Sequence, residues 1–126
     1  MTVNGKEIGF YFSTRAMMWL APYCPDGDPN RLHECFLETD YQKRAEFTAR
    51  FLAILANAYE ASAVREDPTH VAVHWDPEEF LDDISAQEAV ELETMATQAY
   101  IEHKKVTVLT EPKKTSAGGG RTKKSS

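Results

Sequence analysis

Val3-Asn-Gly-Lys-Glu-Ile-Gly-Phe-Tyr-Phe-Ser-Thr-Arg-Ala-Met-Met-Trp-Leu20 is the stretch that decides the fold. Asn4-Gly5 predicts a two-residue β-hairpin turn, because both residues tolerate the positive φ that such a turn requires. Ser13 or Thr14 can then cap a short helix, since apolar residues recur at helical spacing from Ala16 to Tyr23. A small strand pair therefore leads directly into helix.

The longest helix is expected from Thr39 to about Ala63. Thr39 and Gln42 fit a capping box, in which Thr39 is the cap and Gln42 reaches back to its backbone. A broad apolar stripe follows, as in a helix that packs against a core. A shorter helix to about Leu37 is expected before it, because Asp28-Pro29 places a capping residue before a proline at the first helical position.

Two further helix starts follow the break at Pro68. Asp76-Pro77 repeats the pattern of a cap followed by proline, and predicts a short helix. Ser85-Ala-Gln-Glu88 fits a second capping box, opening a helix to about His103. Val71-Ala-Val-His-Trp75 alternates between apolar and polar residues, so it is either a strand or an extended connector. We expect a mainly α domain with a short N-terminal β-hairpin (α+β) and about five helices.

Charge divides the chain into two parts. Residues 1–103 carry 7 Lys and Arg against 19 Asp and Glu, a net charge of −12, whereas residues 104–126 carry a net charge of +6. Val106 to Thr110 fits a strand or an apolar docking motif. Residues 111–126 lack large apolar side chains, which favours disorder. We therefore expect one domain over residues 1–110 and a disordered basic tail over 111–126.

Nothing in the chain resembles a signal peptide or a membrane span, so we expect a cytoplasmic protein. Because the cytoplasm is reducing, the two cysteines, Cys24 and Cys35, are expected to be free thiols. With His33 they form an incomplete zinc set. His33 and Cys35 are two residues apart on a predicted helix and therefore point in different directions. We expect no metal site here.

The sequence contains no complete motif for catalysis or cofactor binding. Asp26 to Leu37 begins like a calcium loop but lacks the glycine and the glutamate that such loops require at their sixth and twelfth positions. His70 and His74 are not accompanied by a Ser or Cys nucleophile in a recognisable turn. The acids between Glu78 and Asp83 complement the dipole of a helix start as readily as they would bind a cation. We expect a protein without catalytic residues, cofactor or metal, and not an enzyme.

Aromatic residues are the better indicators of function. A small domain easily covers only one face of a strand, and consecutive aromatic residues in a strand point to alternate faces. Two tryptophans lie near prolines at expected element junctions. These side chains either complete the core or form a partner-binding surface. The candidate partner-binding residues are Phe10, Tyr11, Phe12, Trp19 and Trp75.

Two segments carry a family resemblance. The stretch from Val3 to Met17 and the late helix start Asp76-Pro-Glu-Glu-Phe-Leu81 resemble tail assembly chaperones of long-tailed (siphophage-like) bacteriophages. The resemblance implies a protein that binds the tape measure protein and tail tube subunits during tail assembly. It also implies a place in the host cytoplasm and absence from the mature virion. A homo-oligomer is a further expected partner.

Two other classes of protein compete with this interpretation. An acidic inhibitor that mimics nucleic acid would bind a basic groove of another protein, as the charge of residues 1–103 allows. A nucleic-acid-binding adaptor would act through the basic tail. Such a tail would bind weakly and without specificity, and the acidic body would be repelled by the same polymer. We therefore expect no specific nucleic-acid partner and no membrane partner.

Overall fold

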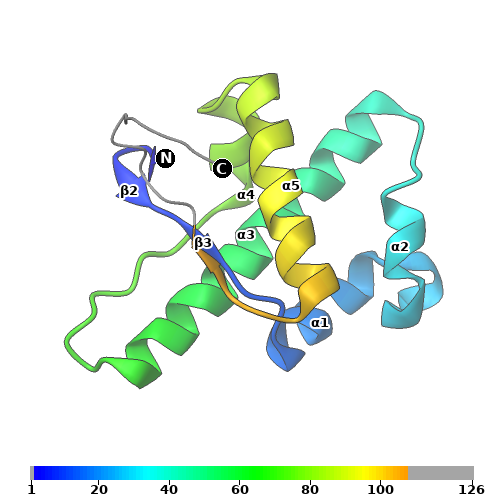
Figure 1. The fold of residues 1–126 in the computed structure, drawn as a ribbon. Coiled ribbons are helices and arrows are strands. Elements are labelled where there is room, and N and C mark those ends of the chain that lie inside the picture. Colours follow the sequence, from blue (N-terminus) through cyan, green and yellow to red (C-terminus); the bar gives the residue numbers. More distant parts are fainter. Residues whose placement is uncertain (1, 108–126) are drawn as a thin grey trace, which may run out of the picture.

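One long helix, α3 (Tyr41–Glu66), organises the structure. The computed structural model describes residues 2–107, which contain five α-helices and four strands of two residues each. In Figure 1, α3 runs across the molecule and α5 (Ala86–Glu102) lies over it. This arrangement confirms the expected fold class, mainly α with a short N-terminal hairpin. The domain boundary expected at residue 110 and the tail expected over residues 111–126 lie outside the described residues.

The N-terminal hairpin forms where Asn4-Gly5 predicts it. Strands β1 (Thr2–Val3) and β2 (Lys6–Glu7) pair antiparallel, with Val3 opposite Lys6. Asn4 and Gly5 have φ values of 53° and 76°, the left-handed conformation that a two-residue hairpin needs at both positions. The turn is therefore set by local chemistry.

The next strand, β3 (Gly9–Phe10), pairs with a distant part of the chain. Its partner is β4 (Val106–Thr107), and the two strands run antiparallel. The Tyr11 amide then donates to the Leu55 carbonyl of α3 at 3.1 Å. Figure 1 shows β3 and β4 side by side near the middle of α3. The edge at Gly9–Phe10 is thus already covered by the chain's own C-terminal side.

Short helical segments connect the hairpin to α3. The hydroxyl of Ser13 caps α1 (Thr14–Leu20) by accepting from the Ala16 amide at 3.1 Å, as expected. Three 3₁₀ turns follow: η1 (Ala21–Tyr23), η2 (Pro25–Gly27) and η3 (Pro29–Arg31).

The single helix expected from Asp28 to Leu37 is wrong in detail. Asp28 does accept from the Asn30 amide at 2.9 Å, but this cap opens η3. An α-helix, α2, follows only over Leu32–Cys35. Hydrogen bonds with i to i+3 spacing close this region, which is typical of short connectors.

The cap of α3 is Asp40, and the expectation of Thr39 is wrong by one residue. The Asp40 carboxylate accepts from the Lys43 amide at 3.0 Å. Aspartate is a stronger N-cap than threonine, so the adjacent acid takes the position.

The core lies along the apolar stripe of α3. Figure 1 shows the other elements distributed along both sides of this helix. The largest fully buried side chains are Trp75, Phe10, Phe51, Ile8, Leu20, Leu32, Leu52, Leu55, Leu92 and Val3.

The segment from Val71 to Trp75 is an extended connector and forms no strand. Two side chains of α3 take up its backbone hydrogen bonds. The amide of Asn57 donates to the Trp75 carbonyl at 2.9 Å and accepts from the Trp75 amide at 2.8 Å. Glu60 accepts from the Val73 amide at 3.0 Å. A neighbouring strand is therefore not needed to satisfy this backbone.

The last two helices begin as the sequence predicts. Asp76 and Glu79 form a capping box at α4 (Pro77–Asp82), and Ser85 and Glu88 form one at α5. Helix α5 ends at His103, whose left-handed φ of 55° turns the chain back towards β4. Helices α4 and α5 both pack against α3.

Candidate protein-binding groove

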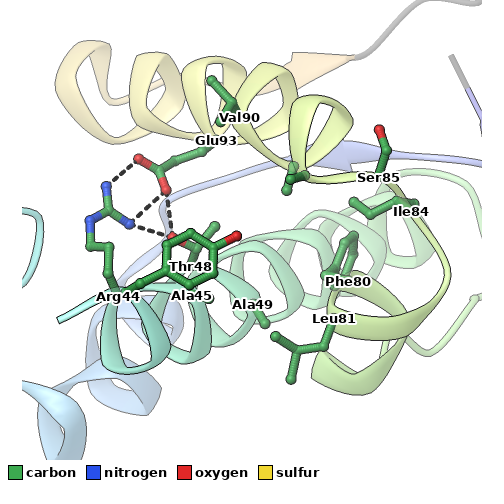
Figure 2. A pocket seen from close by; sticks show the side chains of 13 residues that line it. Arg44, Ala45, Thr48, Ala49, Phe80, Leu81, Ile84, Ser85, Val90 and Glu93 are labelled. Atoms are coloured by element: carbon green, nitrogen blue, oxygen red, sulfur yellow. Dashed lines mark hydrogen bonds and ion pairs between the residues drawn. The ribbon is translucent and has the colours of Figure 1, made fainter.

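A groove opens where α3, α4 and α5 meet. Its volume is about 530 Å³, within the usual size range of a ligand-binding cleft. Figure 2 shows Phe80, Leu81 and Ile84 near one end of it and Arg44, Thr48 and Glu93 near the other. The full lining is Tyr41, Arg44, Ala45, Thr48, Ala49, Phe80, Leu81, Ile84, Ser85, Ala86, Ala89, Val90 and Glu93.

Small residues make the space for this groove. Ala45 and Ala49 are one turn apart on α3, and Ala86 and Ala89 occupy the facing start of α5. Residues three or four apart lie on the same side of a helix, so each pair leaves a shallow surface in the middle. Apolar side chains stand at the edges. Val90 is 67 % exposed and Leu81 is 39 % exposed, so both can contact a partner without rearrangement.

A hydrogen-bonded network closes the end of the groove near α2. The guanidinium of Arg44 donates two hydrogen bonds to the Glu93 carboxylate, at 2.8 and 2.6 Å. The Thr48 hydroxyl donates to the same carboxylate at 2.6 Å and also contacts Arg44. Two parallel hydrogen bonds between a guanidinium and a carboxylate fix both side chains. This pair therefore holds α3 and α5 at a set separation.

The network keeps Glu93 ionised. Burial alone raises the pKa of Glu93, but the hydrogen bonds from Arg44 and Thr48 and the charge of Arg44 outweigh it, so the pKa lies below the ordinary value. The hydrogen bonds to Glu93 likewise raise the pKa of Arg44 against the opposing effect of its own burial. The charge of each group is thus neutralised by the other, and most of the remaining lining residues are apolar.

Helices α4 and α5 give the surroundings of the groove a negative charge. Their sequences contain seven acids and no Lys or Arg. Of the acids, Glu93 is paired with Arg44, and Glu79 is paired with Lys6 at 2.9 Å. Asp82 and Glu91 are exposed. The groove is therefore an apolar surface flanked by acids.

The N-terminal hairpin fixes the position of α4. Glu79 accepts from Asn4 at 3.0 Å, from Lys6 at 2.9 Å and from the Asp76 amide at 3.0 Å. Asn4 also donates to Asp83 at 3.0 Å. Although burial raises the pKa of Glu79, these hydrogen bonds and the charge of Lys6 lower it to about 2. The hairpin thus supports one wall of the groove.

Three of the five aromatic residues singled out from the sequence lie in the core. Phe10 and Trp75 are fully buried, and Phe12 is 9 % exposed. Phe12 packs edge to face on Tyr100, with ring centroids 4.8 Å apart. Trp75 packs on Phe80, the residue that forms the floor of the groove near α4. A partner can reach these three side chains only if the core opens.

The other two, Tyr11 and Trp19, are accessible but lie away from the groove. Tyr11 is half-buried, with the Lys105 ammonium 5.4 Å from its ring centroid. Trp19 is 40 % exposed, and the Arg15 guanidinium lies 5.9 Å from its ring. The structure does not bring the five residues together into one surface.

The sequence analysis does not predict this groove, because it takes aromatic residues as the main indicators of a binding surface. The signal was present in the alanines at 45 and 49 and at 86 and 89, where small side chains interrupt otherwise amphipathic helices. Their effect depends on the packing angle of α5 on α3, and a single sequence does not supply that angle.

The described residues contain no set of side chains arranged for metal binding. No group of three or more His, Cys, Asp or Glu within residues 2–107 is placed to hold a metal ion. His70 lies 2.8 Å from the buried Glu60 and serves to hold the connector against α3. None of the helices in this region is long and apolar enough to cross a membrane.

Comparisons with known proteins add no relative. No protein-family model matches the chain, and no curated protein and no solved structure matches it either.

Proposed function

We propose that this protein is an assembly chaperone that acts by binding a helical segment of another protein in the groove between α3, α4 and α5. In line with the resemblance of residues 3–17 and 76–81, the proposed setting is tail assembly of a long-tailed bacteriophage. The proposed clients are the tape measure protein and tail tube subunits. Binding involves no catalysis.

The apolar groove is the observation that carries this proposal. Its middle is lined by alanines and its edges by exposed Leu81 and Val90. An amphipathic helix binds such a surface through apolar side chains that recur every three or four residues. By covering the apolar face of such a helix, a chaperone keeps an unassembled client from aggregating.

The charge around the groove defines the chemistry of the bound segment. Because α4 and α5 carry acids and no Lys or Arg, a helix with basic residues beside its apolar face fits best. Opposite charges chiefly raise the association rate and select among partners. Apolar burial supplies most of the affinity. Binding should therefore survive high salt, although it forms more slowly there.

A photo-crosslinking experiment tests the proposal. A photoreactive amino acid is placed at position 90 in the groove and, as a matched control, at position 101, where Ile101 of the same helix is 65 % exposed. Each protein is then co-expressed with the products of its neighbouring genes. Crosslinking to a long helical protein from position 90, and not from 101, is the expected result.

The alternative of an acidic inhibitor predicts a different outcome. Such a protein would crosslink to a nuclease or polymerase, and the complex would dissociate in high salt because its affinity is electrostatic. Equal crosslinking from positions 90 and 101 would contradict the groove as the binding site. The acids of residues 1–103 are distributed among helix caps and several helix faces, which favours the chaperone proposal.

A further inference from the structure

The two cysteines of the chain bond to the same short stretch of backbone. The Cys24 thiol donates to the Leu20 carbonyl at 3.4 Å, and the Cys35 thiol donates to the Tyr23 carbonyl at 3.6 Å. These two carbonyls belong to the same turn, at the end of α1 and in η1. The Tyr23 carbonyl that accepts from Cys35 belongs to the peptide bond that leads into Cys24, which places the Cys35 sulfur beside the backbone of Cys24. Both sulfurs are free.

The two thiols differ in accessibility. Cys24 is buried, with 6 % of its surface exposed, whereas Cys35 at the end of α2 is only partly buried. A small oxidant can therefore reach Cys35 first. Cys24 lies behind it, in position to react with whatever forms there. An accessible cysteine next to a second, protected one is the arrangement of a reactive and a resolving thiol.

We propose that Cys24 and Cys35 are a reversible modification site, at which a small-molecule disulfide such as oxidised glutathione converts the two thiols into an intramolecular disulfide. The Cys35 thiolate attacks one sulfur of the oxidant after losing its proton to water, and one small thiolate leaves. The Cys24 thiol then loses its proton to water, its thiolate attacks the Cys35 sulfur of this mixed disulfide, and the second small thiolate leaves. The two released thiolates take up the two protons. The cysteines are oxidised and the oxidant is reduced to two thiols.

The bridge would stiffen the segment beside the aromatic core. It would close the loop of residues 24–35, which contains η2 and η3. Phe36 follows directly and packs on Phe47 and Phe51, with ring centroids 5.1 Å away in each case. A cross-link between residues that are close together in the folded chain restricts the unfolded chain more than it strains the folded one. The melting temperature should therefore rise by about 5 °C or more.

The surroundings of the thiols make the reaction slow at neutral pH. Burial, aided by Cys35 and Asp28, raises the pKa of Cys24 to about 11. Burial also raises the pKa of Cys35, where Glu34 adds to the effect and Arg44 opposes it. Because the thiolate is the nucleophile, the reaction should be several-fold faster at pH 9 than at pH 7.

Intact mass spectrometry of the native chain with oxidised glutathione tests the proposal. The expected product has lost two hydrogen atoms, yields a peptide pair joined through Cys24 and Cys35, and returns to the starting mass with a reducing agent. The Cys24→Ser variant should stop at the mixed disulfide on Cys35. The Cys35→Ser variant should react at neither position while folded.

Four results would overturn the proposal. They are a wild-type product that stops at the mixed disulfide, disulfide-linked dimers in place of the intramolecular bridge, a bridge that forms only in denaturant, and a bridged form that melts at a lower temperature than the reduced form. If the Cys24→Ser variant fails to fold, the wild type alone decides the matter. Its two thiols should disappear at the same rate when followed by alkylation and mass spectrometry.

Discussion

Glu93 of α5 accepts two hydrogen bonds from the Arg44 guanidinium of α3, so an ion pair joins the two helices at one end of the groove. The side chains of Arg44 and Glu93 are 25 % and 20 % exposed. A charged group this far from water depends on its partner, because an unpaired charge bears the full cost of its desolvation. The pair is therefore expected to matter more than a surface salt bridge.

The Glu93→Gln substitution should lower the free energy of unfolding by about 1–3 kcal/mol, since Arg44 loses its charged partner while keeping its position. Urea denaturation measures this loss. Glu91→Gln, at an exposed position of the same helix, is the matched control and should stay within about 0.5 kcal/mol of the wild type. Equal effects of the two substitutions would mean that the Arg44 pair contributes no more than a surface acid.

Gly9 is required by the close approach of β3 to Tyr59. A Cβ atom at this position would lie 2.6 Å from the Tyr59 ring, which is closer than atoms pack. Tyr59 also shares a hydrogen bond of 3.0 Å with Thr107 of β4. Gly9→Ala should therefore displace the ring and weaken the β3–β4 pair, at a cost of about 1–3 kcal/mol. Thermal unfolding measures this cost.

A second substitution separates this clash from other effects. Tyr59→Leu in the Gly9→Ala background removes the ring that the new methyl group meets, and should recover part of the lost stability. No recovery would show that the clash with the Tyr59 ring is not the cause.

Acid should destabilise the protein partly through Glu79. Its pKa is about 2 in the folded protein against an ordinary value of 4.5. A carboxyl whose pKa is lowered by folding stabilises the protein above its unfolded pKa, and this contribution is lost as the pH falls through the folded value. The loss attributable to Glu79 should therefore fall between about pH 4.5 and pH 2.

The Glu79→Gln variant isolates this contribution. Its free energy of unfolding should be lower than that of the wild type at pH 7, and it should decline less steeply from pH 4.5 to pH 2. Chemical denaturation at a series of pH values measures both slopes. Glu78→Gln, next to it on the exposed side of α4, should retain the wild-type slope. Parallel curves for wild type and Glu79→Gln would contradict the assignment.

Local signals predicted much of this fold. The Asn4-Gly5 turn and the caps at Ser13, Asp76 and Ser85 involve residues within one or two turns of each other, and all four form as expected. The sequence predicts the cap of α3 one residue too early, because Thr39 and Asp40 both suit the position.

Contacts between residues far apart in the chain could not be predicted from the sequence. The pairing of Gly9–Phe10 with Val106–Thr107 joins the two ends of the described chain, and the connector before Trp75 is extended because Asn57 of α3 binds its backbone. The groove also depends on contacts between distant residues, since its shape is set by how α5 crosses α3. For the aromatic residues the sequence leaves two alternatives open, core or partner-binding surface, and burial decides for the core at Phe10 and Trp75.

The most direct test of the proposed function compares client binding by two variants of α5. Val90→Glu places a charge at the exposed edge of the groove, and Ile101→Glu places the same charge at an equally exposed position of the same helix outside the groove. Isothermal titration with the co-purified client should give at least about tenfold weaker binding for Val90→Glu, a loss of roughly 1.4 kcal/mol or more, and wild-type affinity for Ile101→Glu. Wild-type affinity for Val90→Glu, with its fold intact, would contradict the groove as the client site.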